Sequence, residues 1–455
     1  MFSQKTYTTR RETLKKNMGK GLLLFLGNDE ASCNYENNTY PYRQDSTFLY
    51  YFGLNYAGLS AIIDIDEGRE IMFGDELTVD DIVWMGTQPT LHEKCSATGI
   101  SELMPSASLA DYLKKAQQKA QQIHFLPSYR PEHKIKLWNL LDVRPGEENS
   151  SEDFVKAVVD MRNYKTEEEI DEIEKACLIT ADMHLAAMKT IRPGIYEYEV
   201  AAAVQEVAQR NNCTLSFPII ASIDGQTLHN HYHGNKIKAG DLFLVDAGAE
   251  TQRGYAGDMS STTPVGGKLT ERQREIYKIQ SAMHDKSVEA LKPGIAFEEI
   301  YNISARVMVE GLKQVGLMKG DACEAVNEGA HALFYPHGLG HMMGLDVHDM
   351  ENLGEIYVGY GGKPKSHQFG RRSLRLARDL ETGFVHTIEP GIYFIPELID
   401  QWKTKNKLAH FINYELAETY KNFGGIRNEE DYLITETGAR LLGKRIPRTV
   451  EEIET

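Results

Sequence analysis

Residues 240–264, "GDLFLVDAGAETQRGYAGDMSSTTP", contain two strand-like segments separated by a short polar one. "LFLVDAG" predicts a buried strand that ends in Asp246, and "YAGDMSST" predicts a second strand that carries Asp258. "AETQRG" between them supplies turn residues, so the whole segment predicts a β-hairpin. The two aspartates are an even number of residues apart, and directly opposed hairpin positions share a face. Both carboxylates could therefore point into one pocket.

Two buried carboxylates on one face repel each other unless a cation lies between them. The simpler interpretation is two aspartates that flank a turn, each solvated or capping a backbone amide. These residues alone favour the simpler interpretation, so other parts of the chain must decide whether the hairpin carries a site.

A second segment, "HGLGHMMGLDVHD" (residues 337–349), holds three histidines. His337 and His341 are four residues apart, a spacing that would place both on one face of a helix. The segment is rich in glycine and lacks the glutamate of HExxH, so it predicts looped or extended backbone that passes close to a ligand. One histidine alone is more often structural, but three together with a preceding proline favour a site.

Two segments with acidic residues follow. "VHTIEPGIYF" (residues 385–394) places Glu389 at the end of an apolar strand, before a Pro-Gly turn. "FGGIRNEEDYLITETG" (residues 423–438) places Arg427 and the pair Glu429 and Glu430 at the start of a strand. Taken singly, these acids are explained as strand punctuation or as a charged strand entry on the surface.

The four segments together offer two aspartates, two glutamates and at least one imidazole. A ligand set made mostly of oxygen suits hard divalent ions such as Mn²⁺ better than a sulfur-rich zinc site does. Four carboxylates are too many for one ion and fit two, as in centres that activate water and stabilise the oxygens of a transition state.

The bulk composition limits the classes of function. A chain of 455 residues predicts two domains, and a net charge of −16 argues against nucleic acid as a partner. The five cysteines are scattered and form no CxxC pair, which indicates free thiols in a reducing compartment. "GLLLFLG" (residues 21–27) imitates a signal peptide, but it is short and lacks a cleavage site, so a buried first strand is the better interpretation. No run reaches membrane-spanning length, and we expect a cytoplasmic protein with no membrane partner.

Residues up to about Arg162 alternate helices and strands, which predicts an α/β domain. Thr166 and Glu169 form a capping box that opens a long amphipathic helix, so we expect the domain boundary near Arg162. "TIRPGIYEYEVAAAVQ" (residues 190–205) and "ALKPGIAFEEIYNISA" (residues 290–305) share one pattern of helix end, Pro-Gly and acidic helix start. The repetition predicts two related halves in the second domain, although helix–Pro-Gly–helix also arises by chance.

With these motifs the chain resembles the Xaa-Pro metallopeptidases of the pita-bread fold, the family of prolidase and aminopeptidase P. "YPYRQDSTFLYYFGL" (residues 40–54) resembles the marker of that family's N-terminal domain. The resemblance implies an α+β pita-bread catalytic domain at residues 163–455, with a curved antiparallel sheet flanked by helices. It also implies a smaller creatinase-like α/β domain at residues 1–162. It further implies two divalent ions, most simply Mn²⁺ with Zn²⁺, Co²⁺ or Fe²⁺ as alternatives, on the metal ligands Asp246, Asp258, His341, Glu389 and Glu429.

The resemblance also implies roles for other side chains. His337 and His348 resemble outer histidines that stabilise the charge developing on a tetrahedral intermediate, and Glu389 would shuttle a proton to the leaving proline nitrogen. In "LHNHYH" (residues 228–233), His229 occupies the family position and His231 is a close rival. Arg427 resembles the arginine that supports the glutamate ligands. The catalytic set is thus His229, His337, His348 and Glu389, and the substrate-binding set is His229, His231, His348, Arg375 and Arg427.

The subfamily depends on the long segment before Glu389. "GRRSLRLARDLETG" (residues 370–383) resembles prolidase, in which an arginine matching Arg375 grips the carboxylate of a dipeptide. We therefore expect an Xaa-Pro dipeptidase that acts on proline-containing peptides as a homodimer or higher homo-oligomer. The alternatives are an aminopeptidase P acting on tripeptides and longer substrates, a hydrolase of a non-peptide C–N bond, and a catalytically silent peptide-binding relative.

Overall fold

The computed structural model describes residues 1–147 and 149–454. The chain divides into two compact units, each with its own core. The first unit is Met1–Arg162 together with Met350–Tyr357, and the second is Asn163–Asp349 and the chain from Val358 onward. The short segment Met350–Tyr357 thus belongs to the first unit, although it lies within the range expected for the catalytic domain. Tertiary contacts decide to which unit such a segment belongs, and these contacts cannot be read from the position of the segment in the sequence.

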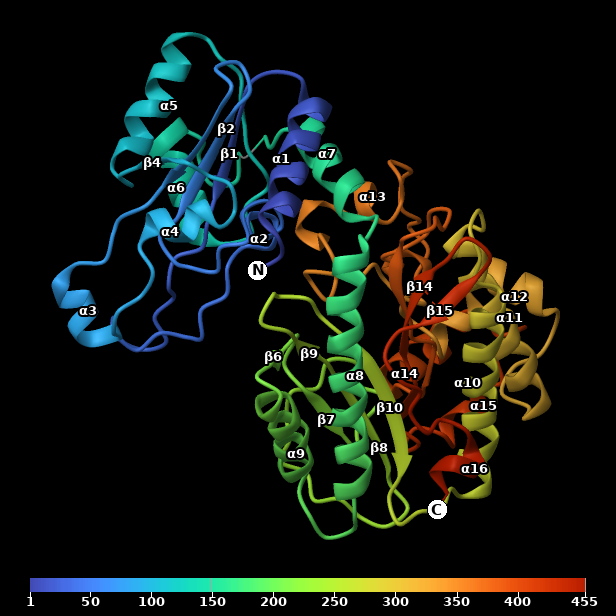
Figure 1. Cartoon of the computed structure of the whole chain (residues 1–455). Helices are drawn as coiled ribbons and strands as arrows, with labels where there is room; N and C mark the ends of the chain where they lie inside the picture. The colour runs from blue at the N-terminus through green and yellow to red at the C-terminus, as the bar shows by residue number, and fades with distance from the viewer. Residues whose placement is uncertain (148, 455) are drawn as a thin grey trace. The chain divides into compact units, whose positions relative to one another are not determined.

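The first unit is a mixed sheet covered by helices on both faces (Figure 1). Its strands run in the order β4-β3-β2-β1-β5, with antiparallel pairs at the centre and parallel pairs at both edges. The elements are α1 Gln4–Met18, β1 Leu22–Leu26, α2 Ser46–Phe52, β2 Ser60–Asp64, β3 Arg69–Phe73, α3 Val79–Met85, α4 Leu91–Ser96, β4 Glu102–Met104, α5 Ser108–Gln118, β5 Ile123–His124, α6 Pro131–Leu141, α7 Glu152–Arg162 and the 3-10 turn η2 Glu351–Leu353, with α13 Glu355–Val358 at its junction with the second unit.

Strand β1 shows why its sequence is a continuous apolar run. Leu24 packs in a cluster with residues of α5 and α6, whereas the neighbouring Phe25 faces the other way and meets the rings of Phe52 and Phe154. A strand that is buried on both faces cannot alternate polar and apolar residues. "GLLLFLG" is therefore the buried first strand that the sequence predicts.

The second unit is built from helices around antiparallel strand pairs (Figure 1). Its elements are α8 Glu167–Thr190, α9 Glu197–Arg210, β6 Thr214–Leu215, β7 Ile220–Ser222, β8 Leu242–Ala247, β9 Ala249–Glu250, β10 Met259–Pro264, α10 Glu271–Glu289, α11 Phe297–Gln314, α12 Ala322–Glu328, η1 Ala330–Leu333, η3 Arg371–Ser373, β11 Val385–Ile388, β12 Gly391–Tyr393, α14 Pro396–Thr404, α15 Tyr414–Glu418, β13 Gly425–Arg427, β14 Glu430–Ile434, β15 Ala439–Leu441 and α16 Val450–Ile453. The predicted capping box of Thr166 and Glu169 is present at the start of α8.

The two Pro-Gly segments occupy equivalent places. The first joins α8 to α9 and the second joins α10 to α11. The backbone amide of Gly194 donates to the carbonyl of Ile237, and that of Gly294 donates to the carbonyl of Leu380. In return, the Ile237 amide donates to the carbonyl of Ile195, and the Leu380 amide donates to the carbonyl of Ile295. The repeated pattern therefore marks two related halves, as the sequence predicts.

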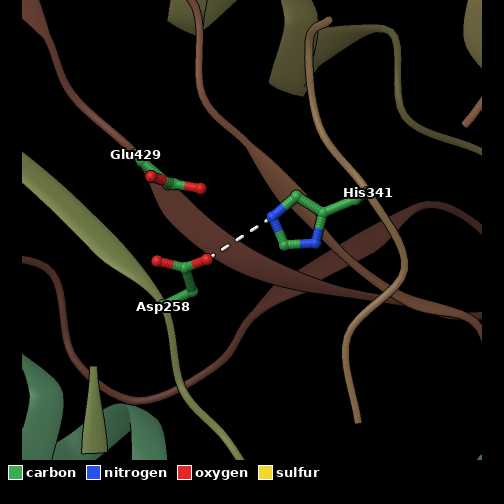
Figure 2. Close-up of side chains that lie close together, drawn as sticks. All are labelled: Asp258, His341 and Glu429. Atoms are coloured by element: carbon green, nitrogen blue, oxygen red, sulfur yellow. Dashed lines mark ion pairs between the residues drawn. The ribbon is translucent and has the colours of Figure 1, made fainter. Parts of the chain in front are cut away.

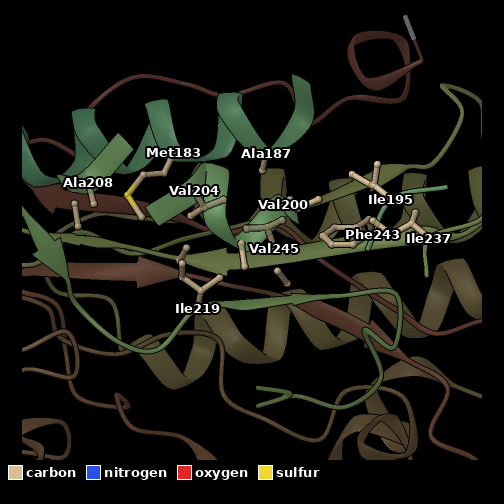
Figure 3. Packing of buried hydrophobic residues seen from close by; sticks show 14 of the residues in the cluster. Met183, Ala187, Ile195, Val200, Val204, Ala208, Ile219, Ile237, Phe243 and Val245 are labelled. Carbon is tan, nitrogen blue, oxygen red and sulfur yellow. The ribbon is translucent and has the colours of Figure 1, made fainter. Parts of the chain in front are cut away.

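The core of the first half lies between helices α8 and α9 and the strands behind them (Figure 3). Met183 of α8 and Val204 of α9 meet Phe243 and Val245 of β8 in one buried cluster. This burial fixes the position of β8, in which Asp246 directly follows Val245. The apolar face of the hairpin thus holds its polar end in place.

The hairpin of β8 and β10 has the expected turn at residues 251–254, but its register differs from the expected one. Asp246 pairs with Ser260, and Asp258 comes one residue before β10 begins. The two aspartates are therefore diagonal neighbours and not directly opposed. They still share a face, because a displacement of two positions preserves side-chain direction in a strand.

Among the helices of the described residues, none is long and apolar enough to cross a bilayer.

Candidate metal centre

One cavity of about 220 Å³ in the second unit is lined by every side chain that the sequence singles out for a site. These residues come from distant parts of the chain and include carboxylates, imidazoles and guanidinium groups. The predicted residues in its lining are His229, His231, Asp246, Asp258, His337, His341, His348, Arg375, Glu389, Arg427 and Glu429.

Three of the predicted metal ligands form a compact cluster (Figure 2). One ligand atom each of Asp258, His341 and Glu429 lies within 4.8 Å of the other two. The Nε2 atom of His341 is 3.4 Å from Oδ2 of Asp258, and the three side chains point toward one another. All three are buried, so the cluster is a preformed polar centre.

His341 is aimed by its backbone. Residues 337–341 form irregular chain and not a helix, as the glycines predict. The His341 amide donates to the Thr387 hydroxyl at 3.2 Å, and the Thr387 amide donates to the His341 carbonyl at 3.0 Å. Nδ1 of His341 lies 3.1 Å from the carbonyl of Met342, which it can only approach as a donor. Nε2 is thus left as the lone-pair nitrogen that faces Asp258.

Glu389 and Asp246 complete the carboxylates. Glu389 directly follows β11, as predicted, and its Oε1 is 4.0 Å from Nε2 of His341. Asp246 is the penultimate residue of β8 and forms a buried ion pair with Arg427. The structure thus brings all five predicted ligands to one cavity, with His341 between Asp258 and Glu389.

The placement of Arg427 and Glu429 corrects one expectation. They do not share the start of a single strand: Arg427 ends β13, Glu430 begins β14, and Glu429 lies in the junction. The Glu429 amide donates to the Ser260 carbonyl at 3.0 Å, and the Ser260 hydroxyl donates to the Glu429 carboxylate at 2.7 Å. This break in the strand turns Glu429 into the cavity.

Glu430 points elsewhere. Its carboxylate accepts a bond from the Tyr432 hydroxyl at 2.8 Å and lies 3.5 Å from Nε of Arg448. Glu430 does not line the cavity. The geometry therefore favours Glu429 over its neighbour as the ligand.

A hydrogen-bond network links the ligands to His337. Nε of Arg427 donates to the Ser260 hydroxyl at 2.9 Å, and its Nη1 donates to the Tyr393 hydroxyl at 3.1 Å. The Tyr393 hydroxyl lies 2.8 Å from Nε2 of His337. Arg427 thus contacts Asp246, Ser260 and Tyr393 at once, as expected for the supporting role that the family resemblance implies.

The buried carboxylates of the cluster repel one another, which favours the binding of a cation. Burial, reinforced by the other carboxylates, raises the pKa of Asp258 and of Glu429 well above the usual range, and burial raises the pKa of Glu389 to about 7. The Oδ1 atoms of Asp246 and Asp258 are buried without a hydrogen-bond partner. Unpartnered carboxylate oxygens around a lone imidazole nitrogen are suitable donors for a divalent ion, so the residues present fit a metal centre.

The imidazoles of the cavity are held neutral. Burial lowers the pKa of His341 well below its usual value and that of His337 to about 3. Burial, with Arg427 nearby, also lowers the pKa of His229. Neutral imidazole is the form that binds a metal or donates one hydrogen bond without adding charge.

The rest of the cavity wall contains both polar and apolar residues. His348 stacks edge-on against His341, with ring centroids 4.2 Å apart. Arg375 and Ser373 line the same cavity, and both His229 and His231 reach it, so the choice between these two histidines stays a prediction. The apolar residues of the lining are Phe217, Pro218, Ile220, Leu228 and Val347.

Sequence reasoning missed three polar residues that support the site. Tyr393 and Ser260 connect Arg427 to its surroundings, and the carboxylate of Asp431 accepts the backbone amide of Asp258 at 3.0 Å. Tyr393 lies four residues after Glu389, and Asp431 lies two after Glu429, so proximity to a predicted ligand was the one available signal. Their partners are distant in sequence, and spacing alone cannot reveal them.

Comparison with known proteins agrees with this geometry. Residues 171–436 match the model of "Metallopeptidase family M24", and residues 7–124 match "Aminopeptidase P, N-terminal domain". The chain belongs to metallopeptidase family M24. It is therefore a metallopeptidase, and the expected fold of a pita-bread catalytic domain with a smaller N-terminal domain is confirmed.

Two curated relatives represent different specificities. The Xaa-Pro dipeptidase of Mus musculus is 30% identical over 467 residues, covering 97% of this chain and 90% of the relative. The Xaa-Pro aminopeptidase of Escherichia coli is 30% identical over 468 residues, covering 100% of this chain and 97% of the relative. Overall identity thus does not separate a dipeptidase from an aminopeptidase.

Solved structures in the family superpose over the whole chain. Zinc-substituted aminopeptidase P of E. coli in complex with product has a TM-score of 0.81 at 29% identity, covering 100% of this chain and 98% of that one. Proline aminopeptidase P II from Yersinia pestis has a TM-score of 0.81 at 28% identity, covering 100% and 99%.

Proposed function

We propose that this metallopeptidase hydrolyses the Xaa-Pro bond at the N-terminus of short peptides and favours Xaa-Pro dipeptides. The observation that carries the proposal is the convergence of four carboxylates and His341 in a small cavity that also contains Arg375. A centre of this composition supports hydrolysis, and a cationic side chain in its wall supports recognition of a nearby carboxylate.

We propose that His341 and the four carboxylates of the cavity are the metal ligands. They would hold two divalent ions, most simply Mn²⁺, with Zn²⁺, Co²⁺ or Fe²⁺ as alternatives. Such ions, when bound, polarise a peptide carbonyl and lower the pKa of water. The proposed ligands are Asp246, Asp258, His341, Glu389 and Glu429.

Glu389 is the proposed proton carrier. It is the most exposed carboxylate of the cavity, with a side-chain exposure of 18%, and it faces His337 at 3.6 Å. The leaving proline nitrogen comes from a tertiary amide and must be protonated before it departs as an amine. A partly exposed carboxylate at this position can take up a proton and return it to that nitrogen.

The histidines have distinct proposed tasks. His229 and His348 line the cavity beside the cluster and would donate hydrogen bonds to the oxygen on which charge develops. His337 has both ring nitrogens engaged, at 2.7 Å from the Gly338 carbonyl and 2.8 Å from the Tyr393 hydroxyl. His337 must therefore exchange one partner before it can donate to substrate.

Arg375 is the residue proposed to select substrates by their length. If its guanidinium binds the C-terminal carboxylate of Xaa-Pro, a dipeptide places that carboxylate correctly and a tripeptide does not. The alternative is an Xaa-Pro aminopeptidase that accepts tripeptides and longer peptides, which the similarity to the E. coli enzyme supports.

The decisive experiment compares Ala-Pro with Ala-Pro-Ala as substrates of the Mn²⁺-loaded protein and of Arg375→Ala. Arg372→Ala serves as a matched control, because Arg372 lies in the same run but does not line the cavity. Cleavage of Ala-Pro alone, lost in Arg375→Ala and kept in Arg372→Ala, supports the dipeptidase. Equal or better cleavage of Ala-Pro-Ala supports the aminopeptidase. Cleavage of neither by metal-loaded protein supports a silent peptide-binding relative.

A homodimer or higher homo-oligomer in the cytoplasm is also proposed. Helix α3 has no buried residue and presents Val79, Val83 and Trp84 to solvent, which is an unusual surface for an isolated unit. Cys33 and Cys323 are exposed free thiols, as suits a reducing compartment. Sedimentation velocity at micromolar concentration tests the assembly: a clean monomer contradicts it, and Val83→Asp should dissociate a dimer formed through α3.

A further inference from the structure

A buried ion pair lies behind the loop that carries His348. Nζ of Lys165 is 2.9 Å from Oδ2 of Asp349, and each side chain is 1% exposed. Neither residue lines the cavity, and neither enters the proposed ligand or substrate sets. Asp349 directly follows His348, so the pair acts on the backbone that carries this histidine.

Lys165 is itself held by the scaffold. It precedes Thr166, the N-cap of α8, so its backbone is fixed by the start of a 24-residue helix. Its amide also donates to the carbonyl of Gly383 at 2.9 Å, just before strand β11. The ammonium group is therefore presented from two rigid elements and is not on a free surface chain.

Asp349 forms hydrogen bonds within the loop of residues 342–349. Its backbone amide donates to the carbonyl of Met342 at 2.9 Å, which ties the two ends of residues 342–349 together. Its Oδ1 accepts the backbone amide of Asp346 at 3.3 Å, while Oδ2 receives the ammonium of Lys165. One carboxylate thus connects the interior of the loop to the helix scaffold.

Gly344 shows how closely the pair fits the loop. A Cβ atom at this position would lie 2.7 Å from Oδ2 of Asp349 and 3.0 Å from Cε of Lys165. The ion pair therefore packs on the bare Cα of this glycine. The Gly344 carbonyl in turn accepts the amide of Ala256, two residues before Asp258. The same loop is thus attached to the segment that ends in a proposed metal ligand.

The other side of the loop forms the cavity wall. Val347 and His348 both line the cavity, and the His348 ring packs on the ring of His341 at 4.2 Å. We infer that Lys165 and Asp349 are positioning residues for the peptidase reaction, which hold His348 at the place where it meets substrate. This inference rests on the proposed function of the cavity.

A purely structural role explains the pair less well. Burying two charges costs desolvation energy, and an apolar pair of similar volume usually stabilises a protein as well or better. The ion pair adds a fixed geometry. The buried Asp349 carboxylate is held in one position because it accepts from both the Lys165 ammonium and the Asp346 amide. A displacement of about 1 Å at a catalytic group can cost about 100-fold in rate, so this geometry has a measurable consequence.

The test uses the full chain loaded with Mn²⁺, with Ala-Pro and Ala-Pro-Ala as substrates. Lys165→Met removes the cation but keeps a similar length, and Lys165→Met/Asp349→Asn removes both charges so that no unpaired charge stays buried. Arg274→Met is the control, because it breaks a partly buried pair with Glu454 in the same unit without touching the loop. Melting temperature and bound Mn²⁺ are measured for each variant.

The expected result separates position from stability. Lys165→Met should lower kcat about 100-fold with little change in KM and no loss of bound Mn²⁺. The double variant should recover the melting temperature but not kcat. Recovery of both together, or an equal loss of kcat in Arg274→Met, overturns the inference.

A cycle with His348→Ala shows whether Lys165 acts through this histidine. If it does, Lys165→Met should lower kcat/KM by no more than about twofold further in the His348→Ala background. Losses that multiply fully in that background overturn the inference and leave the proposed function standing.

Failure of the proposed function is distinguished by the unmodified protein. If it cleaves neither substrate with Mn²⁺ bound, the function is wrong, and crystal structures of the unmodified protein and Lys165→Met decide the positioning role. A displaced His348 ring supports it, and an unmoved ring overturns it.

Discussion

Nε2 of His337 and the hydroxyl of Tyr393 lie 2.8 Å apart, and this contact sets the tautomer of the histidine. Arg427 can only donate, and its Nη1 lies 3.1 Å from the same hydroxyl. The hydroxyl proton is therefore directed to Nε2, and Nδ1 of His337 carries the hydrogen that meets the Gly338 carbonyl. The hydroxyl of Tyr393 thus connects His337 to Arg427, the residue that supports the proposed metal ligands.

Tyr393→Phe should lower kcat about tenfold and leave KM nearly unchanged, because it removes the hydrogen bonds that orient His337 and Arg427. Steady-state kinetics on the better of the two proline substrates measure this. Tyr414→Phe is the control, since that buried hydroxyl bonds the Lys407 carbonyl away from the cavity. Equal kinetics for Tyr393→Phe and the unmodified protein would show that the phenol does not orient the site.

Glu429→Gln should weaken binding of divalent metal by about 100-fold or more, since it removes a charged donor from the cluster with Asp258 and His341. Isothermal titration with Mn²⁺ and metal analysis after dialysis measure the loss. Glu430→Gln is the adjacent control: its carboxylate faces Tyr432 and Arg448, so metal binding should persist. If Glu430→Gln loses metal and Glu429→Gln keeps it, the ligand assignment is wrong.

The contribution of the carboxylate cluster to the stability of the metal-free protein should fall as pH rises. Burial raises the folded-state pKa of Glu389 from about 4.5 to about 7, so folding favours its protonated form. That contribution is fully present below pH 4.5 and is lost as pH rises through about 7. The raised pKa values of Asp258 and Glu429 act in the same direction.

Thermal melts of EDTA-treated unmodified protein and of Glu389→Gln between pH 5 and pH 8 measure this loss. The melting temperature of the unmodified protein should fall relative to that of Glu389→Gln, because the buried histidines such as His337 and His341, whose lowered pKa acts in the opposite direction, are common to both proteins. Mn²⁺ should reverse the trend in the unmodified protein because ligand binding needs the ionised carboxylates. A difference between the two melting temperatures that stays constant across this range, or that changes in the opposite direction, would contradict the assignment of a crowded carboxylate cluster.

Gly340→Ala should destabilise the protein by about 1–3 kcal/mol and reduce metal binding. A Cβ at this position would lie 2.1 Å from the carbonyl oxygen of Thr387, so the backbone that aims His341 must shift. Gly438→Ala is the control, because its Cβ would meet no atom closer than 3.8 Å. Melting temperature and Mn²⁺ titration check both variants, and an unchanged Gly340→Ala would show that this close approach is dispensable.

Much of the fold is encoded locally. The capping box at Thr166, the apolar run of β1 and the Pro-Gly segments each determine an element through the preferences of a few neighbouring residues. The two related halves are visible in the sequence for the same reason, because each half repeats the same local signals. Glu389 could be placed at a strand end because an apolar run and a Pro-Gly turn bracket it.

The ligand candidates came from the chemistry of four separate segments and from the family resemblance, which together name the residues that one cavity collects. The elements, the repeat and the set of reactive side chains can therefore be read from the amino-acid sequence. The register of the hairpin, the strand break that aims Glu429, and the contacts of Tyr393 and of the Lys165–Asp349 pair were decided by tertiary structure. The reason is physical: these features depend on partners far apart in the chain, which meet only when the helices and strands pack together.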